Sequence, residues 1–403
     1  MRFKRFLLLQ NGLDHPGGHW LPETKSLKEA VIQAGMQWHC FANSRLDKNL
    51  AAQLNVDPVV PFLHGNILAG NDPQTRLASF MMAAEALPAT LHRHYPGSPS
   101  SHDLLHVGWT TDLEIIGIAR WLESIPLGSR PAISFFLHRP PGDWNVDPTT
   151  LSVSGDFHRW HYAISRLKRA QPRVTFSSLD PILSTLLSQI LSIPVLFLPV
   201  IQGNAAAGSS AYPNPSFDLG IFGASRPEQG IRRLPEILER LRQRHPSLKS
   251  YIQILGREHE SFLRPRIHPS WLDTNVSLSV GHLEKQAQLD RMADCKLLLL
   301  PYDPKVYCLT ASAIFTDALS LGLPVVVPSL TSMGRMILSG TATGMVYQSN
   351  DADSVADIVL KSLNNWGNLR TRAMDLSKGF KERHSAAYII KEVCSAFARK
   401  DSR

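Results

Sequence analysis

The sequence predicts an α/β protein made of two Rossmann-like, doubly wound domains that face a ligand cleft. Short apolar runs bounded by turn residues alternate with longer helical patterns along the chain, which is typical of parallel βα units. The chain has 403 residues, more than one hydrophobic core usually supports. A small, polar stretch rich in Pro and Gly, 201–216, is expected to link the two halves.

Residues 1–200 are expected to form the N-terminal domain. Its apolar runs, such as FFL and VLFL, are continuous rather than alternating because both faces of a parallel sheet are buried. The predicted strands are Phe3–Gln10, Met36–Ala42, Val59–Leu63, Leu104–Gly108, Ala132–Leu137, Val174–Ser177 and Pro194–Pro199. The predicted helices include Lys25–Gly35, Asp112–Glu123, His158–Ala170 and Asp180–Leu191.

Residues 217–385 repeat this alternation and are expected to form the C-terminal domain. The predicted strands are Asp218–Phe222, Tyr251–Leu255, Val276–Val280, Lys296–Leu300, Pro324–Val327 and Met345–Gln348. The predicted helices include Gln229–Arg244, whose leucines and isoleucines follow a helical period, and Ala311–Leu321. A last helical stretch within 386–403 is expected to pack back on the N-terminal domain.

Composition excludes several classes of protein. With 43% apolar and 19% charged residues and no repetitive tract, the chain is not expected to be disordered. Its four cysteines form no CxxC pair, which argues against a zinc knuckle or a disulfide framework. The apolar run Phe6–Leu9 is too short for a signal peptide, and no stretch approaches the ~20 apolar residues of a membrane span. We expect a cytoplasmic protein and leave peripheral contact with the inner face of the plasma membrane open.

The net charge of +8 indicates an anionic partner, but charge alone does not choose which. Many arginines lie within 232–244 and are expected to form a solvated helix face. Aromatic and basic residues do not interleave as in a stacking platform, which argues against nucleic acid. Sixteen histidines invite a metal site, but pairs such as His15/His19 and His158/His161 lack the setting or partners for one, so no metal is expected.

The segment 301–328, PYDPKVYCLTASAIFTDALSLGLPVVVP, contains a proline-ended loop, a helix with an acidic residue before Ala-Leu, a Gly-x-Pro turn and a Val-rich strand. This order resembles the donor-binding segment of the retaining GT-B glycosyltransferases often called family four. The stretch 221–237, IFGASRPEQGIRRLPEI, looks like the opening of their C-terminal domain. The resemblance implies a nucleotide-sugar-dependent hexosyltransferase that retains anomeric configuration and needs no cofactor.

An anionic donor fits this resemblance, because helix N-termini bind pyrophosphate through free N–H groups and the helix dipole. We expect such termini near Gln229-Gly230 and near Thr310–Ser312. Asp317 stands where the family has glutamate and is expected to accept the ribose hydroxyls, with an exposed helix aspartate as the alternative. The predicted donor-binding residues are Gly17, Gly18, Gly223, Gln229, Gly230, Gly256, Arg257, Tyr302, Thr310, Ser312 and Asp317.

Two residues are predicted to be catalytic. Arg226 could pair with the β-phosphate as the sugar bond breaks. His138 ends a predicted strand and resembles the histidine that faces the donor sugar, although a structural histidine is the alternative. The family arginine and lysine are replaced by Ala224 and Gln229, and its first glutamate by Leu309. These departures make a degenerate scaffold, which binds nucleotide or glycan without turnover, the main alternative function.

Two further alternatives belong to other classes. A sugar-nucleotide epimerase would need a buried acid and base in the cleft, and a basic scaffold for membranes or nucleic acid would bind with a steep salt dependence. The expected partners are therefore a nucleotide sugar and a glycan or lipid-linked acceptor, with contact to an anionic membrane left open.

Overall fold

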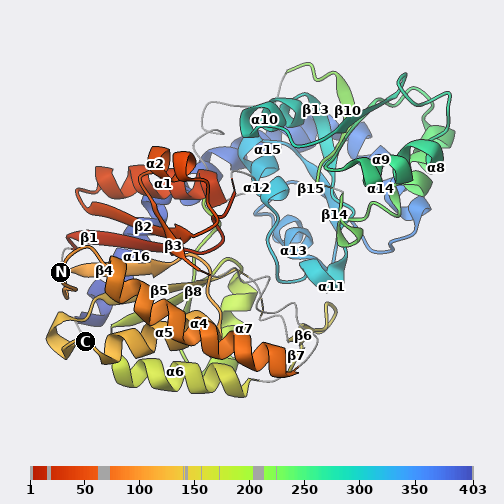
Figure 1. The fold of residues 1–403 in the computed structure, drawn as a ribbon. Coiled ribbons are helices and arrows are strands. Elements are labelled where there is room, and N and C mark those ends of the chain that lie inside the picture. Colours follow the sequence, from red (N-terminus) through yellow and green to blue (C-terminus); the bar gives the residue numbers. More distant parts are fainter. Residues whose placement is uncertain are drawn as a thin grey trace. The chain divides into compact units, whose positions relative to one another are not determined.

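The computed structural model describes residues 3–15, 20–61, 73–138, 140, 144–155, 157–171, 173–202, 213–223 and 225–401. The chain forms two compact units. Unit 1 comprises Met1–Asn145, Ser154–Gly203 and His384–Arg403, and unit 2 comprises Val146–Val153 and Asn204–Arg383. Each unit holds one parallel sheet with helices on its faces, so the predicted fold class is confirmed (Figure 1).

The sheet of unit 1 runs in the order β3-β2-β1-β4-β5-β8-β9. Its strands are β1 (Arg5–Gln10), β2 (Gln37–Asn43), β3 (Asp57–Val60), β4 (Asp103–Val107), β5 (Ala132–Leu137), β8 (Val174–Ser178) and β9 (Val195–Phe197). The chain first adds strands on one side of β1 and then on the other, so the order reverses between β1 and β4. Every residue of β4 and β5 is buried, as expected for the centre of a parallel sheet.

The helices of unit 1 begin at recognisable caps. In α5, Thr111 and Glu114 form a capping box, and in α7 the carboxylate of Asp180 accepts two backbone N–H groups ahead of Pro181. The helices are α1 (Trp20–Gln33), α2 (Lys48–Leu54), α4 (Pro73–His94), α5 (Asp112–Glu123), α6 (His158–Ala170), α7 (Pro181–Leu191) and α16 (Ala386–Asp401). A short 3-10 turn, η1 (Leu127–Ser129), follows α5 in the chain. The hairpin of β6 (Asn145–Val146) and β7 (Val153–Ser154) comes before α6, and its residues Val146–Val153 group with unit 2. The C-terminal helix α16 packs against α1 and β8.

The sheet of unit 2 runs in the order β12-β11-β10-β13-β14-β15, which is the Rossmann order. Its strands are β10 (Phe217–Ile221), β11 (Ser250–Ile254), β12 (Val276–Val280), β13 (Cys295–Leu299), β14 (Val325–Pro328) and β15 (Gly344–Tyr347). All of its adjacent strands pair in parallel. The order reverses between β10 and β13.

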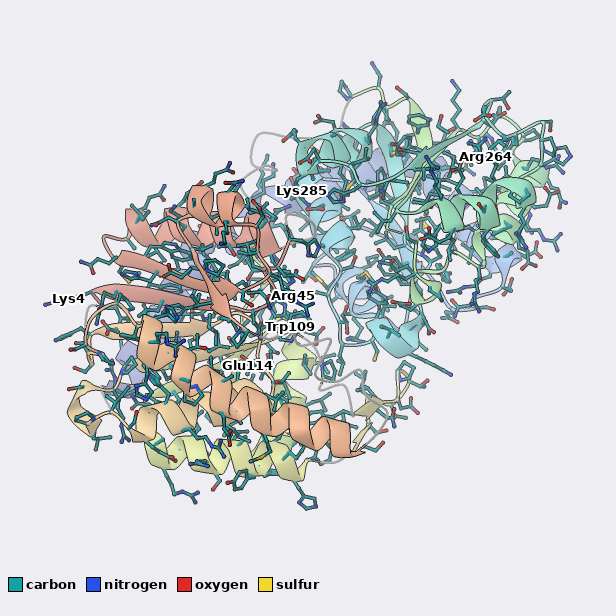
Figure 2. All side chains as sticks on the ribbon, viewed as in Figure 1. Lys4, Arg45, Trp109, Glu114, Arg264 and Lys285 are labelled. Carbon is teal, nitrogen blue, oxygen red and sulfur yellow. The ribbon has the colours of Figure 1, made fainter. Side chains whose placement is uncertain are left out.

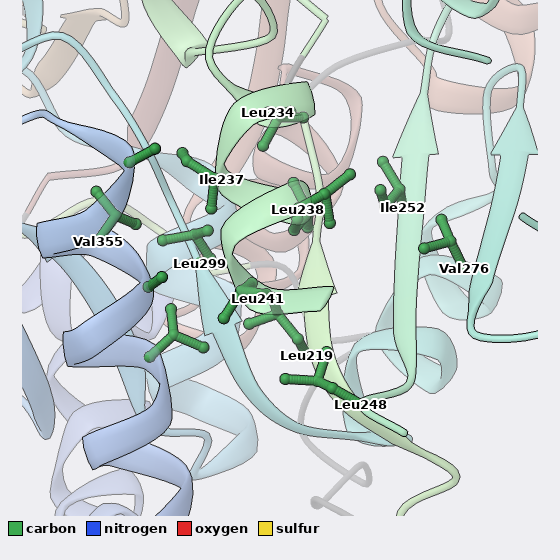
Figure 3. Close-up of a cluster of buried hydrophobic side chains, with 14 of the residues drawn as sticks. Leu219, Leu234, Ile237, Leu238, Leu241, Leu248, Ile252, Val276, Leu299 and Val355 are labelled. Carbon is green, nitrogen blue, oxygen red and sulfur yellow. The ribbon is translucent and has the colours of Figure 1, made fainter. Parts of the chain in front are cut away.

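Helices cover both faces of this sheet. They are α8 (Leu234–Arg244), α9 (Arg257–Leu263), α10 (Lys285–Ala293), α11 (Pro304–Tyr307), α12 (Ala313–Leu321), α13 (Ser332–Leu338), α14 (Ala352–Asn364) and α15 (Trp366–Arg383), with 3-10 turns η3 (Pro227–Gln229) and η4 (Arg264–Arg266). On α8, Leu234, Ile237, Leu238 and Leu241 are all buried and face β10, β11 and α14 (Figure 3). This apolar stripe at helical spacing docks α8 on the sheet.

The start of α8 corrects a prediction. The sequence predicts a helix from Gln229, but α8 begins at Leu234 and a short 3-10 turn precedes it. Gly230 has a φ of +90°, in the left-handed region, which interrupts helical continuity. Pro235 lies in the first turn of α8, where its missing N–H costs nothing. The helix N-terminus expected near Gln229-Gly230 is therefore a 3-10 turn.

Most other differences concern element ends. α1 begins at Trp20 rather than Lys25, because Pro22 is tolerated in a first helical turn. The long helix α4, which carries Pro88 inside it, is not predicted from the sequence. Residues 203–212 of the expected linker lie outside the described residues, and so do Gly17 and Gly18.

Candidate functional site

The candidate site of unit 2 lies at the carboxyl ends of β10 and β13, between which the strand order reverses. Doubly wound sheets bind their ligands outside this edge and at this switch point. β10 leads into Phe222 and Gly223, and β13 leads into Pro301 and Tyr302. Gly223 and Tyr302, both predicted for the site, therefore stand next to the switch point.

The loops that follow these two strands are joined by close contacts. A Cβ atom on Gly230 would lie 2.3 Å from the carbonyl oxygen of Pro301, so only glycine fits. Arg233 Nη2 donates to the same oxygen at 2.7 Å, and the N–H of Asp303 donates to the Glu228 carbonyl at 2.8 Å. Packing thus accounts for Gly230, and its role toward a ligand stays a prediction.

Arg226 presents an exposed guanidinium beside these loops. Its Nη2 donates to the hydroxyl of Tyr307 at 3.3 Å, and its Nε lies 3.3 Å from a carboxylate oxygen of Glu228. Its backbone N–H donates to Oε1 of Gln229 at 3.2 Å. The side chain is 61% exposed, so a cation is available to an anionic ligand from solvent.

Tyr302 lies beneath this surface. It is only 1% exposed, and its ring centroid lies 4.4 Å from that of Tyr307. Desolvation raises the pKa of both phenols above the usual value. The buried position suits a side chain that supports the Gly223 loop and the start of α12.

Ser312, predicted as a donor-binding residue, caps the N-terminus of α12. Ser312 Oγ accepts the N–H of Phe315 at 3.3 Å, which is N-cap geometry. Thr310 is half-buried, and its carbonyl accepts a hydrogen bond from Ser332 Oγ at 2.8 Å. With the Ser312 hydroxyl engaged in the cap, the backbone N–H groups of the first turn are the better candidates for anion binding.

Asp317 lies in the second turn of α12, but it is not the exposed helix aspartate weighed as an alternative. Its side chain is 5% exposed, and Oδ2 lies 2.5 Å from Nζ of Lys285, the first residue of α10. Sequence reasoning missed Lys285, because it lies in another helix and no local pattern connects the two residues.

The end of β11 contributes a further part of the same edge. Gly256 is the N-cap of α9, and Arg257 is the first residue of that helix with an exposed side chain. The N–H of Leu255 donates to the buried hydroxyl of Ser225 at 2.8 Å, which joins this strand end to the loop after β10. The structure therefore brings Gly256 and Arg257 to the edge of the sheet that carries Gly223 and Arg226.

In unit 1, His138 lies at the carboxyl end of β5 within an aromatic cluster. Its ring centroid lies 5.0 Å from that of Trp20 and 5.3 Å from that of Trp109, which is nearly parallel to it. Nε2 lies 2.7 Å from the Gly108 carbonyl oxygen, so Nε2 carries the proton and donates. This hydrogen bond fixes the orientation of the ring, and the role of His138 toward a sugar stays a prediction.

Buried polar side chains lie at the same edge of unit 1. Glu114 accepts hydrogen bonds from Asn11 and Thr111, and burial raises the pKa of its carboxyl to about 7 (Figure 2). Both side-chain polar atoms of the fully buried Gln10 have no partner among the described residues. Glu114 is not among the predicted site residues, although its Thr-x-x-Glu capping pattern at 111–114 is visible in the sequence.

The arginines of α8 form ion pairs with nearby carboxylates. Arg244 lies 2.5 Å from both Asp353 and Asp357, and Arg242 lies 2.5 Å from Glu239. These pairs lie at the surface, with arginine side chains 28% and 33% exposed, and they join carboxylates of α8 and α14 to the arginine face. In the described residues no cluster of three or more His, Cys, Asp or Glu side chains is arranged to hold a metal ion. None of the helices described there combines the length and apolar character of a membrane span.

Comparison with known proteins finds likeness in structure alone. No protein-family model matches the chain, and no curated protein matches it. HepE of Anabaena in complex with UDP is 15% identical, with a TM-score of 0.64 over 98% of this chain and 100% of HepE. A glycosyltransferase of Rickettsia africae is 9% identical, with a TM-score of 0.66 over 98% of each chain. Trehalose-6-phosphate synthase of E. coli, bound with UDP-2-fluoro glucose, is 10% identical, with a TM-score of 0.64 over 97% of this chain and 99% of that one. At these identities the likeness shows the fold, which is GT-B.

Proposed function

We propose that the protein is a glycosyltransferase that moves a sugar from a nucleotide diphosphate to a hydroxyl acceptor with retention of configuration. The observation that carries this proposal is the GT-B fold with a capped helix, a buried acid and a glycine turn at the switch point of unit 2. HepE has been crystallised with UDP-glucose, and the E. coli structure holds UDP-2-fluoro glucose. A nucleotide-diphosphate sugar is therefore the donor class that we propose for this chain.

The donor would lie along the carboxyl edge of unit 2. Its diphosphate would meet the first-turn N–H groups of α12, where the helix dipole favours an anion, and the backbone near Gly223 and Gly230. Thr310 would lie beside the phosphates. Asp317 would accept hydrogen bonds from the ribose hydroxyls, since an ionised carboxylate is a strong acceptor.

Stabilisation of the negative charge on the leaving group is the main catalytic contribution that we propose. When the bond between the anomeric carbon and the diphosphate breaks, negative charge builds on the phosphate oxygens. The acceptor oxygen would attack from the face that the diphosphate leaves, and its proton would pass to a phosphate oxygen. Arg226 and Arg257 are exposed cations at this edge, and no protein nucleophile or metal is assigned.

Unit 1 is proposed to bind the acceptor. The Nε2–H of His138 is directed at the Gly108 carbonyl, which fixes the ring at the carboxyl end of β5, and we propose that this ring lies beside the acceptor. Trp20 and Trp109 add aromatic surface beside it. The net charge of +8 favours an anionic glycan or a lipid-linked acceptor, and hence a cytoplasmic protein in peripheral contact with an anionic membrane.

A degenerate scaffold is the second candidate. Ala224, Gln229 and Leu309 replace the arginine, lysine and glutamate of the family that the sequence resembles. Such a scaffold would bind the nucleotide without transferring its sugar.

Calorimetric binding of the purified protein to UDP, GDP, ADP and their sugar conjugates tests the proposal. We expect selective binding of one nucleotide with a Kd of roughly 1 μM to 1 mM. Asp317→Ala should weaken it by about tenfold or more, because it removes hydrogen bonds to a charged acceptor. Asp218→Ala is the matched control. Asp218 lies 2.7 Å from Lys296, and the pair stands near the amino ends of β10 and β13, at the other end of the strands from the candidate site.

Transfer is then measured with the selected donor and a panel of acceptors, and the anomeric configuration of the product is read by NMR. Retention supports the full proposal. Nucleotide binding without transfer to any acceptor favours the degenerate scaffold, and no binding by folded protein rejects both.

A further inference from the structure

A partly buried ion pair joins α10 and α12 in unit 2. Lys285 Nζ lies 2.5 Å from Asp317 Oδ2, and the side chains are 33% and 5% exposed, respectively. The two helices lie side by side (Figure 1). Asp317 is the one charged residue of α12, whose sequence is AIFTDALSL.

Burial of this carboxylate is costly. Its helix neighbours Phe315, Ala318 and Leu319 are buried apolar side chains of the core, so Asp317 sits at the margin of an apolar environment. Removing a carboxylate from water costs several kcal/mol, which a paired cation recovers only in part. Replacing such a pair as a whole by well-packed apolar residues is often neutral or stabilising, so stability alone is weak grounds for an acid at this position.

The position of the pair points to a ligand. Lys285 follows the end of β12 by a short loop, and the side chain of Gln253 anchors that loop by donating to the Gly281 carbonyl at 2.7 Å. Asp317 lies one turn beyond the N-cap Ser312 at the end of the helix that we propose meets the diphosphate. The partly exposed Lys285 keeps one side of the pair accessible (Figure 2).

We propose that Lys285 is a positioning residue for the nucleotide: its ammonium holds the ionised carboxylate of Asp317 in the orientation that meets the ribose hydroxyls. This inference rests on the proposed function. A carboxylate has about four lone-pair positions, so it can accept from Lys285 and from hydroxyl groups at the same time. Lys285 thereby contributes to discrimination between a ribose and a deoxyribose without contacting the sugar itself.

Calorimetric titration with UDP and with 2′-deoxy-UDP tests this role, because their Kd ratio reports the contact to the 2′-hydroxyl. We expect wild-type protein to bind UDP about tenfold more tightly than 2′-deoxy-UDP. Lys285→Met, similar in shape but uncharged, should weaken UDP binding by about tenfold and bring the ratio close to 1. Lys285→Arg should restore most of the ratio, since it keeps a cation beside the carboxylate.

Lys296→Met is the matched control. Lys296 also pairs with an aspartate of unit 2, Asp218, at 2.7 Å and with a similar exposure of 35%. The Lys296→Met variant should leave both the UDP affinity and the Kd ratio of UDP to 2′-deoxy-UDP unchanged. A general effect of losing a lysine ion pair in unit 2 would appear equally in both variants and would overturn the inference.

The double variant Lys285→Met/Asp317→Asn separates positioning from direct contact and leaves no charge unpaired if Lys285→Met does not fold. It should bind UDP as weakly as Asp317→Asn, and no more weakly. Weaker binding by the double variant would place Lys285 on the nucleotide itself and overturn the positioning role. An unchanged ratio in Lys285→Met would also overturn it while the proposed function stands, whereas no binding of UDP, GDP or ADP by folded wild-type protein would reject both.

Discussion

At the scale of single residues, two buried carboxyl groups of unit 1 link the stability of the fold to pH. Glu23, in the first turn of α1, is only 4% exposed, and burial raises the pKa of its carboxyl to about 8. Burial likewise raises the pKa of Glu114 to about 7. Both groups bind a proton more tightly in the folded chain than in the unfolded chain, where the value is 4.5.

Glu23→Gln is expected to stabilise unit 1 at alkaline pH. Below pH 4.5 both states carry the proton, and between 4.5 and about 8 the unfolded chain ionises first, so wild-type stability falls as pH rises. The neutral glutamine removes this loss, and its advantage should grow to a few kcal/mol by pH 8. Urea unfolding at pH 5 and pH 8, with hydrogen exchange of peptides from α1, measures it.

Glu29→Gln provides the comparison, because Glu29 is an exposed carboxylate on the same helix. It should change stability little and equally at both pH values. If Glu23→Gln shows the same difference from wild type at pH 5 and pH 8, then Glu23 is not protonated in the folded protein.

At the scale of the element, the start of α12 combines a stabilising cap with a proposed anion site. Ser312→Ala removes the acceptor for the Phe315 N–H and should cost about 1 kcal/mol of stability. Fraying of the first turn would also disorder the N–H groups proposed to hold the diphosphate. We therefore expect a lower UDP affinity, measured by calorimetry beside thermal unfolding.

Asp351→Ala is the matched change at another helix. Asp351 caps α14 by accepting the N–H of Ser354 at 2.8 Å. It should cost a similar amount of stability and leave UDP affinity intact. If Ser312→Ala and wild type bind UDP with equal affinity, then the first turn of α12 does not bind the diphosphate.

At the scale of the whole molecule, the four free thiols report the integrity of both cores. Cys40 in unit 1 and Cys295 and Cys308 in unit 2 are at most 2% exposed. Cys394 on α16 is partly exposed, and desolvation raises the pKa of its thiol to about 11.

Since the thiolate is the reactive form, native protein at pH 8 should react slowly with Ellman's reagent at Cys394, and all four thiols should react in denaturant. Mass spectrometry of blocked peptides identifies which thiol reacts. Fast reaction of Cys40 or Cys295 in native protein would contradict the burial of β2 or β13.

The alternation of apolar runs and helical patterns was enough to predict the strands, because a strand buried on both faces needs a continuous apolar run wherever it lies in the sheet. β5 and β12 have the predicted bounds, and the other ends shift by a few residues. The N-cap Ser312 was also predictable, because capping is a local interaction between residues three apart.

What depends on distant contacts was decided by the tertiary structure. Glycine is required at position 230 because the carbonyl oxygen of Pro301, 71 positions later in the chain, leaves no room for a Cβ atom. With Gly230 in the left-handed conformation, α8 begins at Leu234 and not at the predicted Gln229. The ion pair between Lys285 and Asp317 joins two helices whose separation in sequence is 32 residues. The sequence alone therefore determined the elements and their class, through local propensity and the apolar pattern. The packing of the loops after β10 and β13, and of helices α10 and α12, decided the surroundings of each site residue. Residues that the sheet brings together from distant parts of the chain leave no local pattern in the sequence.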